Sequence, residues 1–143
     1  MKPLLILVSI AFSACSTPAS RVQLTIGVPQ RGKRVSALVE FPAKITNHSK
    51  QSVWYHGNMG LKMPYYRAFT RPSHGGEWSE LPYWQCGMGA GEFEIPAGAT
   101  AEFHTVAPAH DRGDQYQVEL SIYKSGGGQA KPFSIRSEPV IIP

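Results

Sequence analysis

Residues 111–123 constrain the fold more than any other stretch of this chain. A turn-forming cluster, Asp111, Gly113 and Asp114, leads into a run in which apolar and polar residues alternate strictly. The apolar positions are Tyr116, Val118, Leu120 and Ile122. Because successive side chains of a β-strand point to opposite faces, this alternation predicts a strand with one buried face and one solvent-facing face.

The rest of the chain shows the same short alternating segments, separated by 14 Gly and 12 Pro. We expect further strands near residues 21–28, 35–45, 51–56, 65–70, 77–81, 92–95 and 101–103, and a last strand supplied by residues 133–135 and 139–142. Pro42 interrupts the second of these, which predicts a sheet edge or a bulge there, and residues 96–98 predict a short hairpin. The expected fold is all-β: one domain over residues 21–143, with seven to nine strands in two packed antiparallel sheets.

Two motifs resemble known sandwich families. Asp114, Tyr116 and Val118 follow the Asp-x-Tyr-x-Val pattern of the tyrosine corner in immunoglobulin-like and fibronectin-type sandwiches. The resemblance implies Greek-key connections and a Tyr116 hydroxyl bonded to upstream backbone. Val118 stands where antibody domains have their second cysteine, so an antibody-type domain is not expected. The turn at residues 96–98, with Ala101-Glu102-Phe103 after it, is similar to bacterial surface sandwiches and to BsuPI-type proteinase inhibitors.

The N-terminus carries a targeting signal. Lys2 precedes an apolar run at residues 4–12, which is too short to span a bilayer but has the length of a signal-peptide core. The run ends at Ser13-Ala14-Cys15, which resembles the lipobox that signal peptidase II recognises in bacterial lipoproteins, although Phe12 stands where that family most often has Leu. The alternative is an ordinary secretory signal in which the cysteine is a coincidence.

The lipobox resemblance implies a cellular location and a division of the chain into segments. Residues 1–14 would be the signal peptide, and residues 15–20 would be the lipidated N-terminus and tether. Cys15 would carry a diacylglyceryl thioether and an acylated amine such as a palmitate amide, and such a set of chains anchors a protein stably. Ser16 is not Asp, which in that family favours the outer membrane, with the protein facing the periplasm.

The net charge and the motifs of the chain argue against nucleic-acid binding and against catalysis. The formal charge is +4, and the only local excess, Arg21, Arg31, Lys33 and Arg34, is too small for a nucleic-acid face. No Gly-x-Ser-x-Gly elbow and no phosphate-cradling loop occurs. Asp111 and Asp114 are explained by turn formation. We therefore expect a protein that is not an enzyme and needs no cofactor.

Two alternatives stay open at this point. If Cys15 is lipidated, Cys86 is unpaired; with Met88 and a histidine such as His48 or His56 it could form a cupredoxin-like copper site. Cys86-Gly87-Met88 has no room for the histidine that cupredoxins hold between their Cys and Met, so a buried, inert thiol is the simpler interpretation. A module resembling a proteinase inhibitor is the other alternative.

The irregular middle of the chain, residues 57–91, predicts the binding face. It holds Trp78, Tyr83 and Trp84 beside Gly-rich loops and Cys86. Exposed Trp and Tyr are frequent anchors of interfaces and sugar platforms, although aromatics of sandwiches also serve as core. The sequence thus predicts a non-catalytic envelope module, anchored to the membrane by lipid, that contacts an envelope protein or a glycan through Trp78, Tyr83, Trp84 and Cys86.

Overall fold

The computed structural model describes residues 21–29, 37–82 and 89–143. These residues form eleven strands and a short 3-10 turn, Ala109–Asp111. The strands are β1 (Val22–Ile26), β2 (Leu38–Asn47), β3 (Val53–Asn58), β4 (Met63–Pro64), β5 (Tyr66–Arg71), β6 (Ser79–Glu80), β7 (Ala90–Ile95), β8 (Thr100–Pro108), β9 (Gln115–Tyr123), β10 (Phe133–Arg136) and β11 (Val140–Ile141). The count exceeds the predicted seven to nine because the structure adds β4 and divides the predicted last strand into β10 and β11.

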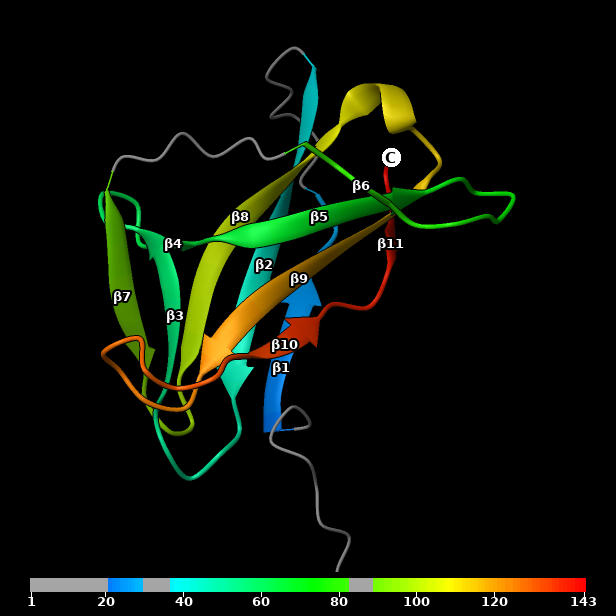
Figure 1. The fold of residues 1–143 in the computed structure, drawn as a ribbon. Coiled ribbons are helices and arrows are strands. Elements are labelled where there is room, and N and C mark those ends of the chain that lie inside the picture. The colour runs from blue at the N-terminus through cyan, green and yellow to red at the C-terminus, as the bar shows by residue number, and fades with distance from the viewer. Residues whose placement is uncertain (1–20, 30–36, 83–88) are drawn as a thin grey trace, which may run out of the picture.

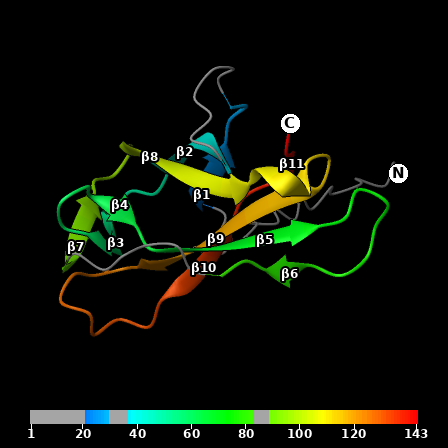
Figure 2. The same cartoon turned by 90° about the horizontal axis from the view of Figure 1, so that it is seen from above.

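The strands form two antiparallel sheets that face each other (Figures 1 and 2). The smaller sheet has the order β1-β2-β8, and the larger one is built around β9. The chain changes sheet between β2 and β3, between β7 and β8, and between β8 and β9, which gives Greek-key connections. The fold is an immunoglobulin-like β-sandwich, as the sequence predicts.

The predicted central strand is confirmed as β9. It pairs with β3 and β5 along one edge and with β10 and β11 along the other. Its inward side chains are almost completely buried: Tyr116, Val118, Leu120 and Ile122 expose between 0% and 2% of their surface. These side chains meet β2 and β8 across the core, where Phe41 stacks on Tyr116 with 5.1 Å between the ring centroids.

Two tyrosines of the larger sheet hold the outer edge of β8. The Tyr116 hydroxyl donates to the Val106 carbonyl at 2.9 Å, which is the bond that the tyrosine-corner pattern predicts. The Val106 N–H donates to the Tyr66 hydroxyl oxygen at 3.2 Å. Both backbone groups of Val106 are therefore satisfied without a further strand beside β8. No local pattern around Tyr66 predicts this contact with β8.

Pro42 lies where the β1–β2 ladder ends. β1 pairs with Ala43 to Asn47 of β2, and the Gly27 N–H donates to the Pro42 carbonyl just beyond. The N–H and C=O of one strand residue point to the same edge, so the N–H that proline lacks would also have faced Gly27. β2 is the middle strand of its sheet and pairs with β8 through Pro42, so Pro42 lies at the end of the described β1 ladder and not on an edge strand.

The predicted hairpin at residues 96–98 is wrong. The turn itself forms, with Gly98 at φ 75° and a hydrogen bond from the Ala99 N–H to the Pro96 carbonyl. However, β7 before it pairs with β3 and β8 after it pairs with β2, so the chain crosses from one sheet to the other here. Alternation alone could not show this, because either connection leaves the same faces buried.

Asn47 holds this crossover together. Its side chain is fully buried, and its Nδ2 donates to the carbonyls of Gln51 at 2.8 Å, Ile95 at 3.0 Å and Pro96 at 3.2 Å. Its backbone N–H and C=O are bonded to Ala99 and Gly98. One asparagine at the end of β2 therefore ties both sheet-changing connections to each other.

Candidate functional site

A break in the line of strands beside β9 produces a hollow in the larger sheet. β3 pairs with Ile122 and Tyr123 of β9, whereas β5 pairs with the stretch from Gln115 to Leu120. Neither strand has a residue in register with Ser121. Between these two contacts, residues 56–65 move away from β9 and return as the β3–β4 hairpin, and a 2.9 Å hydrogen bond from the Tyr65 N–H to the His56 carbonyl closes this excursion.

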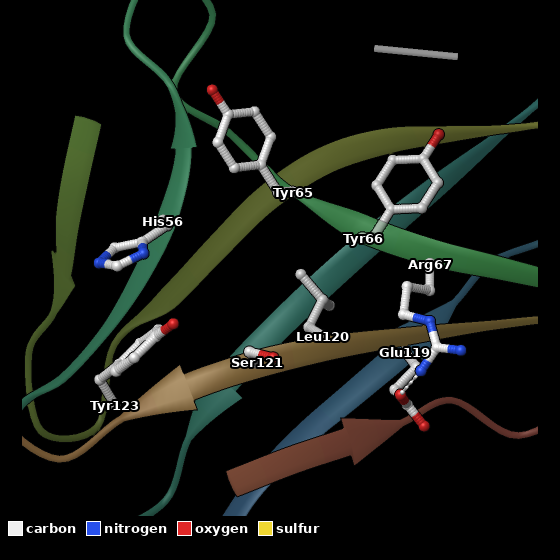
Figure 3. Close-up of a pocket in the computed structure, with 8 residues that line it drawn as sticks. All are labelled: His56, Tyr65, Tyr66, Arg67, Glu119, Leu120, Ser121 and Tyr123. Carbon is white, nitrogen blue, oxygen red and sulfur yellow. Dashed lines mark hydrogen bonds and ion pairs between the residues drawn. The ribbon is translucent and has the colours of Figure 1, made fainter. Parts of the chain in front are cut away.

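An open pocket of about 260 Å³ lies at this break (Figure 3). In Figure 3, His56 and Tyr123 lie at one end, Arg67 and Glu119 lie at the other, and Ser121 lies between them. The full lining is His56, Tyr65, Tyr66, Arg67, Glu119, Leu120, Ser121 and Tyr123. Aromatic rings and hydrogen-bonding groups thus meet in one hollow of the larger sheet.

The His56 end of the pocket is ordered by contacts on both sides of the ring. His56 stacks on Tyr123 with 4.4 Å between the centroids, and its Nε2 lies 3.2 Å from Glu92 Oε2. Glu92 also accepts the Gly127 N–H at 2.7 Å. The Gly127 hydrogen bond, followed by His56, holds the pKa of the Glu92 carboxyl below its ordinary value. His56, β7 and the β9–β10 loop are therefore connected through one carboxylate.

The other end of the pocket is a compact set of paired charges. Arg67 donates to both oxygens of Glu80, at 2.8 Å and 2.6 Å, and to Glu119 at 3.1 Å. Arg136 also bonds to Glu119, and both guanidinium groups lie just over 5 Å from the centroid of the Phe69 ring. The bonded Arg67 lowers the pKa of the Glu80 carboxyl. Neither charge in the pocket, Arg67 or Glu119, is left without an opposite charge.

The β3–β4 hairpin forms one side of the excursion and has a tight backbone approach. A Cβ on Gly57 would lie 2.3 Å from the Met63 carbonyl oxygen, so only glycine allows β4 to pair here. The tip exposes Met59 and Leu61, at 63% and 73% of their surface. Met63 packs against the core instead, and its side chain is half-buried.

Of the predicted binding set, only Trp78 lies in the described part of the chain. Trp78 is half-buried, and Arg71 lies over its ring at 4.8 Å, outside the lining of the pocket. Tyr83, Trp84, Cys86 and the lipidation candidate Cys15 lie outside the described residues. A backbone hydrogen bond is described on each side of residues 83–88. The Leu81 N–H donates to the Ala68 carbonyl before them, and the Met59 N–H donates to the Gly89 carbonyl after them.

Sequence analysis missed the pocket. His56 was expected only as a candidate copper ligand, and Tyr65 and Tyr123 were expected only as strand residues. A signal was present: the segment from Gly57 to Pro64 has no clear alternation, although strands precede and follow it. Such a segment can interrupt a strand line, but its position opposite Ser121 depends on pairing with a segment far away in the sequence.

Two further searches give negative results for the described residues. No group of three or more His, Cys, Asp or Glu side chains is arranged to hold a metal ion in the described part of the chain. No helix among those residues is long and apolar enough to cross a membrane. Cys86 and Met88, on which the copper alternative depends, lie outside those ranges.

Comparisons with known proteins show similarity of fold. A scan against protein-family models and a search of curated proteins found no match. Among solved structures, the Northeast Structural Genomics Consortium target SoR45 matches with a TM-score of 0.53 at 11% identity, covering 87% of each chain. The putative ApaA protein from Bordetella pertussis matches with a TM-score of 0.50 at 12% identity, covering 85% of this chain and 89% of that one. At these identities the likeness concerns the fold alone.

Proposed function

We propose that this protein is a non-catalytic binding or accessory module of the bacterial cell envelope, anchored to the outer membrane through a lipid on Cys15. The observation that carries the binding role is the hollow where β3 gives way to β5. There, His56, Tyr65 and Tyr123 surround Ser121 on a sheet of the sandwich. Aromatic side chains beside hydrogen-bonding groups in a concave site are typical of recognition surfaces.

The lipid anchor is supported by the N-terminal sequence. An apolar run of signal-peptide length ends in Ser13-Ala14-Cys15, and residues 16–20 provide a short polar tether before β1. Two or three acyl chains give stable attachment, whereas one chain binds only marginally. The module would then stand at the membrane surface, facing the periplasm.

The anchor is tested by metabolic labelling with a radioactive or clickable palmitate in a Gram-negative host. The native chain should take up label and sediment with the outer membrane, and Cys15→Ala should lose the label and keep its uncut signal segment. Cys86→Ala is the matched control, because it removes the other cysteine and should label as the native chain does. Equal labelling of the native chain and Cys15→Ala would contradict the proposal.

The binding role is tested by crosslinking and capture from envelope fractions. The sequence also predicts a binding face over residues 57–91, in which Tyr83 and Trp84 are the aromatic pair that it singles out. Replacing both with Ala should abolish capture of a partner without lowering the thermal midpoint of the domain. Capture that is unchanged by the double replacement would count against this segment as the binding face.

A further inference from the structure

We infer that the pocket at the β3–β5 break binds one ring of a neutral sugar, as part of an envelope glycan. This inference rests on the proposed function as a binding module and names the ligand class and the site. It concerns His56, Tyr65, Ser121 and Tyr123, all of which lie in the described part of the chain.

Size is the first reason. The pocket holds about 260 Å³, slightly below the range of about 300–1,000 Å³ that is usual for drug-sized ligands. A single six-membered sugar ring is a ligand of this scale, whereas a folded peptide segment or a nucleotide is larger. The pocket is also open, so neighbouring sugar units of a chain could continue into solvent.

The charge balance is the second reason. Arg67 is the strongest cation of the pocket, but it is already bonded to Glu80 and Glu119. Glu119 is in turn bonded to Arg136 as well as to Arg67, and its side chain is only 13% exposed. An anionic or cationic ligand would have to compete with these pairs, so the pocket favours a ligand without net charge.

The chemistry of the lining is the third reason. Tyr65 and Tyr123 present aromatic rings, against which the apolar C–H face of a sugar can pack. Ser121 and the Tyr123 hydroxyl supply donors and acceptors for ring hydroxyls. A purely apolar ligand would leave these polar groups desolvated and unpaired, which is unfavourable. A polyhydroxylated ring satisfies both kinds of surface.

Order at the site is the fourth reason. The Tyr123 ring is held by its stack on His56, whose Nε2 is held by Glu92. The Tyr65 hydroxyl contacts the Gly89 carbonyl at 3.4 Å. Rings that are already positioned lose little conformational entropy on binding, which favours recognition by a small and weakly interacting ligand.

The test is saturation-transfer NMR on the full chain, purified in a detergent without a sugar headgroup. The probes are glucose, N-acetylglucosamine and the linear tetrasaccharide of each, with glucose 6-phosphate as the charged comparison. We expect transfer to the ring protons of at least one neutral sugar, and at least tenfold weaker binding by Ser121→Tyr, which fills the pocket. Tyr123→Leu, which removes a stacking ring, should weaken binding by a similar factor.

Controls separate this inference from the proposed function. Phe133→Leu changes an aromatic residue of β10 that does not line the pocket and should bind sugar as the native chain does, and thermal melting verifies that each variant is folded. Absence of binding by every neutral sugar, preference for glucose 6-phosphate, or native affinity in Ser121→Tyr would overturn the sugar site. If sugar binding is absent while partner capture still depends on Tyr83 and Trp84, the inference fails and the proposed function stands.

Discussion

Asn47→Ala should be among the most destabilising single changes in this domain. The Asn47 side chain is fully buried and donates to three carbonyls on two connections, of which the bond to Ile95 is entirely buried. Leaving a buried carbonyl without a donor costs about 1–3 kcal/mol. The carbonyls of Gln51 and Pro96 are partly accessible, so water can replace part of their loss.

The expected loss in unfolding free energy is therefore about 2–4 kcal/mol. For a domain of this size, 1 kcal/mol corresponds to a shift of roughly 4 °C in thermal midpoint, so Asn47→Ala should melt roughly 8–16 °C lower. Urea unfolding followed by circular dichroism measures the free energy directly, and an unchanged m-value would show that the native fold is kept.

Ser49→Ala is the matched comparison. Its hydroxyl donates to Asn47 Oδ1 at 2.7 Å, but the residue is half-exposed, so its loss should cost less than about 1 kcal/mol. If Asn47→Ala and Ser49→Ala were equally stable, the reasoning that one buried amide holds the crossover would be refuted.

Asn47→Asp adds a signature in pH. An ionised carboxylate in that position would face the carbonyl oxygens of Ile95 and Pro96, so the folded state should raise its pKa above the ordinary value of about 3.9. A group with a raised folded pKa contributes stability below its unfolded pKa and loses it as the pH rises. This variant should therefore be less stable at pH 7 than at pH 4, relative to the native chain.

Three further outcomes are expected. Tyr116→Phe removes the bond to the Val106 carbonyl and should lower the unfolding free energy, measured by urea titration, by about 1–3 kcal/mol. Tyr123→Phe is the control, because the Tyr123 hydroxyl has no hydrogen bond within the described residues, and its unfolding free energy should stay near the native value. Gly57→Ala places a Cβ against the Met63 carbonyl and should lower the unfolding free energy of the domain by about 2 kcal/mol or more. Gly98→Ala should cost only about 1 kcal/mol, because a Cβ there faces open space and only the positive φ is unfavourable. NMR titration should give Glu92 a carboxyl pKa below about 4.3, with the Gly127 amide shift following it; because the folded pKa is lowered, this contribution to stability is lost as the pH falls through the folded pKa.

The predictions that succeeded rest on local patterns. Alternation at residues 115–123 was sufficient to identify β9 and its buried face, because the period of two is a property of the strand backbone itself. The bond made by Tyr116 followed from its position after a turn.

The predictions that failed or were missing depend on which segments pair. The turn at residues 96–98 formed as expected, but its role as a crossover follows from β7 joining β3 and β8 joining β2. The contributions of Asn47 and Tyr66 likewise depend on carbonyl and N–H groups more than 35 residues away in sequence. A local pattern contains no information about such partners.

The chain's sequence by itself determined an all-β domain, the identity of its central strand and the tyrosine that locks β8 to the larger sheet. Only the tertiary structure decided where the site lies, because the hollow exists at the one position of β9, Ser121, that neither β3 nor β5 reaches. Side-chain alternation is set within a strand, whereas register is set between strands, and a pocket made by a gap in register can be found only after the strands have paired.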